Sequence, residues 1–196
     1  GGDLQSMAAD PAAVAAELIG EMHAGIELLA DLPAPVIASV HGAVAGGGLG
    51  VALACDLIVA AEGTRFNLAY TRIGTSSDCG TSWGLPRWVG LRKALEIALL
   101  CEPFDAAEAL RLGLVNRVVP VEGLAEHTLA LARQIEASAP LALGRLKRLM
   151  RLSDQNDLHT QLEAEAREFV ACAGTADFAE GVSAFLAKRP ARFSGR

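Results

Sequence analysis

The N-terminal part of the chain alternates between two hydrophobic spacings, one typical of helices and one of buried strands. Residues 14–29 carry apolar side chains at helical spacing, and Asp10-Pro11 before them is a favourable helix start. The β-branched run at residues 36–40 predicts a buried strand. An all-round apolar segment, residues 49–55, predicts a buried helix that begins inside the preceding glycines. Further strands are predicted at residues 57–61, 65–68 and 115–119, and the helices between strands imply parallel pairing.

The spacing beyond residue 85 is mainly helical. Helices are predicted at residues 92–101, 106–112, 124–137, 141–151, 157–173 and 178–188. We therefore expect an α/β fold in which residues 1–120 form the core and residues 121–196 a helical C-terminal region. The chain opens on Gly1-Gly2 without a methionine, so we expect that it begins inside a structural unit.

Composition and charge exclude several classes of protein. The chain is 52% hydrophobic and 20% charged, which is typical of a globular protein. Its net charge of −6 disfavours nucleic-acid binding. Its apolar runs are too short to cross a bilayer, and no secretory signal opens the chain, so we expect no membrane segment. The four cysteines lack metal-ligand spacing, which predicts free thiols in a reducing cytoplasm and no metal site.

Three consecutive glycines, residues 46–48, stand between a predicted strand and a predicted helix. A sharp turn there presents bare backbone N–H groups, which favour negative charge. The spacing fits neither a dinucleotide loop nor a phosphate-binding P-loop. Close packing between helix and strand explains such a run as well as a ligand does, so the glycines alone do not define a site.

The sequence around the glycines resembles the signature of the enoyl-CoA hydratase/isomerase (crotonase) superfamily. The resemblance rests on PVIASVHGAVAGGG (residues 35–48) and ACDLIVA (residues 54–60). It continues in GGDL (residues 1–4), in residues 107–119 and in SAFLAKR (residues 183–189). Several ordered motifs therefore carry the likeness across nearly the whole chain.

The resemblance implies a fold of repeated ββα turns that binds acyl-CoA thioesters and assembles as a homotrimer or a dimer of trimers, with its first strands missing from this chain. Coenzyme A would belong to the substrate, and no other cofactor is implied. By motif position, the N–H groups of Gly2 and Gly47 form the oxyanion hole that stabilises a thioester enolate. Gly46, Phe185 and Lys188 match positions that contact CoA.

The reaction depends on which carboxylates are present. Hydratases of this family add water with two glutamates, and the matching positions here are Gly50 and Tyr70. Asp78, in GTSSDCG (residues 74–80), matches the acid of members that shift a double bond or isomerise a ring epoxide on CoA. Such a shift needs one base that moves a proton between two carbons. We therefore predict an isomerase with Asp78 as its catalytic acid/base, although Asp78 could instead cap the helix that follows.

Three alternatives remain open at this point. The resemblance also includes hydratases, and it includes aryl-CoA dehalogenases, which use an aspartate at the position of Asp78 and a histidine at that of His23. Where the dehalogenase pattern has tryptophan, this chain has Tyr70, whose hydroxyl could orient an acyl group or whose ring could line an acyl pocket. His23 could equally be a packed or capping residue. The third alternative is a catalytically degenerate subunit that only binds CoA.

Overall fold

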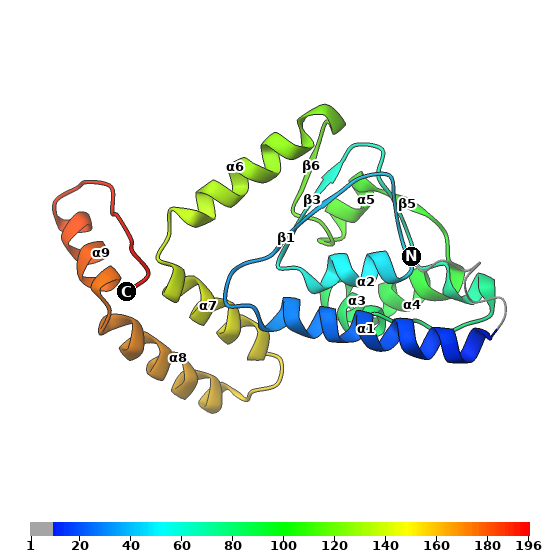
Figure 1. Cartoon of the computed structure of the whole chain (residues 1–196), viewed down its shortest axis with the longest axis horizontal. Helices are drawn as coiled ribbons and strands as arrows, with labels where there is room; N and C mark the ends of the chain where they lie inside the picture. The colour runs from blue at the N-terminus through cyan, green and yellow to red at the C-terminus, as the bar shows by residue number, and fades with distance from the viewer. Residues whose placement is uncertain (1–9) are drawn as a thin grey trace. The chain divides into compact units, whose positions relative to one another are not determined.

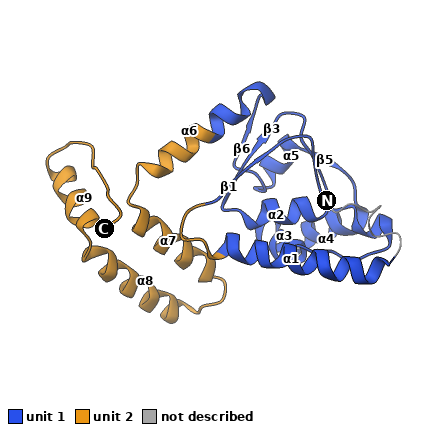
Figure 2. Ribbon diagram, in the orientation of Figure 1, with its two compact units in different colours: residues 1–30, 36–128 blue, residues 31–35, 129–196 orange. Residues whose placement is uncertain are grey.

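The computed structural model describes residues 10–196, and the chain divides into two compact units (Figure 2). The first unit comprises residues 1–30 and 36–128, and the second comprises residues 31–35 and 129–196. The division falls inside a helix, between residues 128 and 129, whereas the sequence placed the boundary at residue 120.

Two three-stranded sheets lie in the first unit. In the first sheet, with strand order β1-β3-β6, both pairings are parallel. In the second, with order β2-β4-β5, the first pairing is parallel and the second antiparallel. The strands are β1 (Ile37–Val40), β2 (Ala43–Ala45), β3 (Leu57–Ala61), β4 (Arg65–Asn67), β5 (Phe104–Asp105) and β6 (Arg117–Val119).

The four strands predicted from the sequence are confirmed, each within two residues at either end. The sequence did not predict β2 and β5, because runs of three and two residues are too short to show a periodic pattern. The expectation of parallel pairing was wrong for β4 and β5. The 3-10 helix η1 and two α-helices, α3 and α4, connect these strands, so the connection is not the single-helix crossover that commonly joins parallel strands.

Helices of the first unit carry or support the glycine loop and the loop of Asp78 (Figure 1). The Asp10 carboxylate accepts a hydrogen bond from Ala13 N at 3.2 Å, so the predicted helix start is confirmed. Helix α2 follows β2 in the chain. It packs against α3, and α3 packs against α4. The helices are α1 (Pro11–Asp31), α2 (Gly47–Ala54), η1, a 3-10 helix (Tyr70–Ile73), α3 (Thr81–Val89), α4 (Leu91–Leu100) and α5 (Ala106–Arg111).

The core of this unit lies between the strands and α2 to α5. Phe66, Leu49 and Leu85 are almost completely buried, and each contributes about 1.5–3 kcal/mol by leaving water. The ring of Phe66 stacks on that of Phe104, with centroids 5.6 Å apart. At the start of β3, Asn116 Oδ1 accepts a hydrogen bond from Ile58 N at 2.7 Å. This core fixes the two strands after which the glycine loop and the Asp78 loop begin.

Helices make up most of the second unit. Glu168 on α8 is buried and accepts hydrogen bonds from Arg145 and Arg148 on α7, which ties these two helices together. Within the described part of the chain, no single helix is long and apolar enough to span a membrane, although α8 and α9 pass as a pair bent by 80°. The remaining elements are η2 (Val121–Gly123), α6 (Leu124–Glu136), which spans both units, α7 (Pro140–Leu152), α8 (Leu158–Ala173) and α9 (Ala176–Leu186).

Candidate active site

The glycine loop leads directly into α2. Gly46 precedes this helix with φ 53° and ψ −127°, a backbone conformation that only glycine adopts without strain. Its N–H donates to Asn67 O at 3.1 Å, which fixes the loop against the end of β4. Gly47 is the first residue of α2, so its N–H has no acceptor within the helix and lies at the positive end of the helix dipole. The predicted donor position is thus at a helix N-terminus.

Asp78 faces the start of this helix. The hydroxyl of Tyr70 donates a hydrogen bond to Asp78 Oδ1 at 2.5 Å. A Cβ atom placed on Gly47 would lie 3.6 Å from the same oxygen. The carboxylate is half-buried, so one of its oxygens is held by the protein while the group retains access to solvent. The structure therefore brings three predicted site residues together.

The alternative in which Asp78 caps α3 is wrong. The capping position of α3 is occupied by Gly80, with φ 69°, and no side chain caps the helix. Asp78 lies two residues before this capping position, and its carboxylate accepts a hydrogen bond from the Tyr70 hydroxyl. The backbone carbonyl oxygen of Asp78 accepts hydrogen bonds from Thr81 N at 3.0 Å and from Thr81 Oγ1 at 2.9 Å. The Asp78 carboxylate therefore makes no capping hydrogen bond to the backbone N–H groups of α3.

Gly50 has no space for a side chain. A Cβ atom at this position would lie 2.3 Å from Cys79 O, 2.6 Å from Cys79 Cβ and 2.9 Å from Thr81 Oγ1. Two of these atoms belong to the backbone or to Cβ, so they cannot move away by a simple rotation. The segment that carries Asp78 therefore occupies the space that a glutamate at position 50 would need.

Two neutral groups surround the carboxylate. Burial, followed by the hydrogen bond to Asp78, holds the pKa of Tyr70 well above its ordinary value. The same two causes, in the same order, raise the pKa of the Cys79 thiol to about 11. Tyr70 therefore remains a hydrogen-bond donor at neutral pH, and Cys79 remains a thiol rather than a nucleophilic thiolate.

His23 contacts the backbone of the same loop. From α1, its Nε2 atom accepts a hydrogen bond from Cys79 N at 3.1 Å, and the imidazole is exposed. The bond joins residues that are 56 positions apart in the sequence. His23 therefore meets the backbone of the residue that follows Asp78.

A cavity of about 240 Å³ opens beside Tyr70. Apolar surface comes from Leu68, which precedes η1, and from leucines of α3 and α4. The loop that contains Asp78 contributes hydroxyl groups. Its lining comprises Leu68, Tyr70, Thr71, Thr75, Ser76, Ser77, Thr81, Ser82, Leu85, Pro86, Leu91, Ala94, Leu95, Ala98 and Leu99. Tyr70 thus belongs both to the carboxylate's surroundings and to a largely apolar cavity wall.

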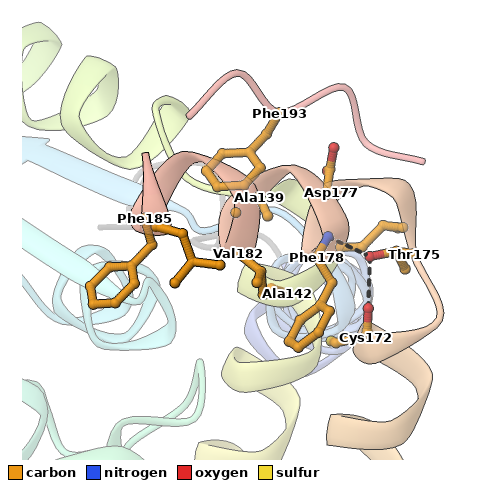
Figure 3. A pocket seen from close by; sticks show the side chains of 12 residues that line it. Ala139, Ala142, Cys172, Thr175, Asp177, Phe178, Val182, Phe185 and Phe193 are labelled. Atoms are coloured by element: carbon orange, nitrogen blue, oxygen red, sulfur yellow. Dashed lines mark hydrogen bonds between the residues drawn. The ribbon is translucent and has the colours of Figure 1, made fainter. Parts of the chain in front are cut away.

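The two residues predicted to contact CoA from the C-terminal helix lie in the second unit. Phe185 is 83% exposed and lines an apolar pocket of about 370 Å³, together with Phe178 and Phe193 (Figure 3). At the start of α9, the Thr175 hydroxyl accepts from Phe178 N at 3.1 Å, which caps the helix. Lys188, exposed just beyond α9, has a left-handed backbone with φ 51°.

Gly2, the other predicted oxyanion donor, lies outside the described residues. Within residues 10–196, no group of three His, Cys, Asp or Glu side chains is placed to hold a metal ion. Sequence reasoning missed Thr81, whose hydroxyl donates to the Asp78 carbonyl oxygen, and Cys79, whose N–H donates to His23. No sequence signal marks them, because their contacts come from segments distant in the chain or from a backbone turn.

Comparisons with known proteins identify the family of this chain. The family model for enoyl-CoA hydratase/isomerase matches residues 1–196. A Rhodobacter capsulatus protein named probable enoyl-CoA hydratase is 39% identical over all of this chain and 76% of its own length. The 1,2-epoxyphenylacetyl-CoA isomerase of Escherichia coli is 40% identical over 87% of this chain and 65% of its own length. The chain therefore spans about two thirds of that isomerase.

Solved structures place the chain in the same fold. An enoyl-CoA hydratase from Bacillus anthracis superposes with a TM-score of 0.96 at 33% identity, covering 100% of this chain and 76% of the other. The fold is thus the crotonase fold, as the sequence predicted. The chain belongs to the enoyl-CoA hydratase/isomerase family, whose members include hydratases and isomerases of acyl-CoA thioesters.

Proposed function

We propose that this protein is an isomerase of acyl-CoA thioesters that shifts a double bond or rearranges a ring epoxide, with Asp78 as its proton shuttle. The observation that carries the proposal is the position of the Asp78 carboxylate, bonded to Tyr70 and facing the start of α2 at Gly47. Both positions that hold glutamate in the family's hydratases lack a carboxylate here, since they are Gly50 and Tyr70. The similarity to 1,2-epoxyphenylacetyl-CoA isomerase supports the same reaction class.

The thioester oxygen would accept hydrogen bonds from the N–H groups of Gly47 and Gly2. With a 3-enoyl-CoA, Asp78 removes a proton from the α-carbon, and the electron pair of the broken C–H bond is delocalised onto the thioester oxygen. The resulting dienolate is conjugated with the double bond between the β- and γ-carbons. Asp78 then returns the proton to the γ-carbon, which leaves the double bond between the α- and β-carbons. The oxyanion donors stabilise the intermediate, and one such donor contributes on the order of 3 kcal/mol to the transition state.

The acyl group would occupy the cavity beside Tyr70, whose wall is mainly apolar. The family resemblance assigns CoA contacts to Gly46 in the first unit and, separately, to Phe185 and Lys188 in the second, both of which are exposed. We also propose a cytoplasmic homotrimer or dimer of trimers, supported by the exposed apolar side chains Phe169, Val170 and Leu186 of the C-terminal helices. Sedimentation of the protein at micromolar concentration tests the assembly, and a monomer would contradict it.

Proton transfer in deuterated water tests the reaction. With 3-enoyl-CoA we expect 2-enoyl-CoA that carries deuterium at the γ-carbon, since a shuttle that exchanges with solvent delivers the label there. Asp78→Asn should lower kcat by about 10²- to 10⁴-fold, because a positioned carboxylate contributes that much, while CoA binding stays nearly unchanged. Efficient formation of 3-hydroxyacyl-CoA from 2-enoyl-CoA would instead identify a hydratase.

The dehalogenase reaction is a second candidate because His23 reaches the loop of Asp78. It has weaker support, since the Nε2 atom of His23 is engaged with Cys79 N and is not free to activate water. Release of halide from a haloaryl-CoA, lost in both Asp78→Asn and His23→Gln, would establish it. Stabilisation by acyl-CoA without any turnover would instead identify a subunit that only binds the thioester.

A further inference from the structure

His23 supports the peptide group that follows Asp78. This peptide group consists of the Asp78 carbonyl and the Cys79 N–H. Its carbonyl oxygen accepts from Thr81 N and Thr81 Oγ1, and its N–H donates to His23 Nε2 at 3.1 Å. Thr81 is fully buried at the start of α3, whereas His23 comes from α1. The peptide plane is therefore held from both sides by different helices.

The local sequence does not favour this conformation by itself. Cys79 has φ 51° and Gly80 has φ 69°, so two successive residues are left-handed. For a residue with a Cβ atom this conformation costs roughly 1–2 kcal/mol, and it persists only where surrounding contacts impose it. The Cys79 side chain is confined, since its Sγ lies 3.0 Å from the position of a Cβ on Gly47. The bond from His23 adds a constraint on the backbone itself.

We infer that His23 is a positioning residue for Asp78: by accepting the Cys79 N–H, it fixes the peptide plane that sets the direction of the Asp78 carboxylate toward α2. The inference rests on the proposed function of Asp78. An Nε2 atom that accepts an N–H must carry its lone pair, so the imidazole is neutral with its proton on Nδ1. His23 thus acts through a backbone hydrogen bond, and not as a base on the substrate.

The test compares two replacements of His23. Gln places a side-chain oxygen near the position of Nε2 and can accept the same N–H, whereas Leu cannot. We expect His23→Leu to lower kcat roughly 2- to 10-fold with little change in KM, since one hydrogen bond is lost, and His23→Gln to restore most of it. His23 is exposed, so neither change should disturb the core. Glu21→Leu, also exposed on α1, is the matched control and should leave kcat unchanged.

Hydrogen exchange at the Cys79 amide gives a readout independent of activity. We expect faster exchange in His23→Leu than in wild type, and slow exchange again in His23→Gln. Wild-type kcat in His23→Leu, or an equal loss in His23→Gln and His23→Leu, would overturn the inference. If Asp78→Asn retained turnover, the proposed function would fail on its own, while amide exchange would still report whether His23 holds the peptide.

Discussion

The hydroxyl of Tyr70 donates a hydrogen bond to Oδ1 of Asp78 at 2.5 Å, between residues that are eight positions apart in the sequence. Burial and this bond raise the pKa of Tyr70, so the donor stays protonated under all ordinary conditions. The tyrosine therefore fixes one carboxylate oxygen, and under the proposed function the other oxygen is the one that transfers the proton.

Tyr70→Phe should lower kcat by roughly 10- to 100-fold, because a hydrogen bond to a charged group is lost while the ring still fills its place. Steady-state kinetics with 3-enoyl-CoA measure the effect. In an Asp78→Asn background the same change should have almost no further effect, since the hydroxyl acts through the carboxylate. Additive losses in the double variant would contradict this relationship.

Gly47 can be tested with a pair of substitutions that differ in one N–H group. Gly47→Ala keeps the N–H and adds a Cβ that meets Cys79 Sγ at 3.0 Å, while Gly47→Pro adds similar bulk and removes the donor. Proline fits the first position of a helix, so α2 should still form. We expect Gly47→Pro to have a kcat about 10²- to 10³-fold below that of Gly47→Ala. Equal kcat values in two folded variants would exclude Gly47 as an oxyanion donor.

Gly50→Ala should destabilise the protein by about 1–3 kcal/mol or more, because its Cβ would lie 2.3 Å from Cys79 O. Gly84→Ala is the matched control: it is also a buried helical glycine, and its Cβ would meet Leu53 Cβ at an ordinary 3.5 Å. Thermal unfolding should show a lower Tm for Gly50→Ala and an unchanged or higher Tm for Gly84→Ala. A Gly50→Ala protein as stable as wild type would show that the Asp78 loop can move away.

The thiol of Cys79 predicts a loss of stability at alkaline pH. Its pKa is raised from 9.0 to about 11 on folding, so the native state favours the protonated form. The resulting stabilisation is fully present below the unfolded pKa and is lost as the pH rises through the folded pKa. The free energy of unfolding should therefore fall between pH 8 and about pH 10.5, and this fall should be smaller in Cys79→Ala than in wild type. Cys172→Ala, at a half-buried position in the second unit, should keep the wild-type difference.

Much of this molecule follows from its sequence. The spacing of apolar residues located α1, β1, β3 and the C-terminal helices, because burial on one face imposes a period that survives in the sequence. The run at residues 46–48 marked the turn into α2, since only glycine tolerates the backbone of Gly46. Through the resemblance to the family, Gly50 and Tyr70 disfavoured hydratase chemistry and Asp78 was the matching candidate acid.

The tertiary structure alone decided how these residues meet. It assigned the cap of α3 to Gly80, filled the space at Gly50 with the backbone of Cys79, and joined His23 to that backbone across 56 residues. It also paired β4 and β5 in antiparallel fashion. These relationships depend on van der Waals distances and on single hydrogen bonds between distant segments, and such contacts impose no periodicity on the residues that make them.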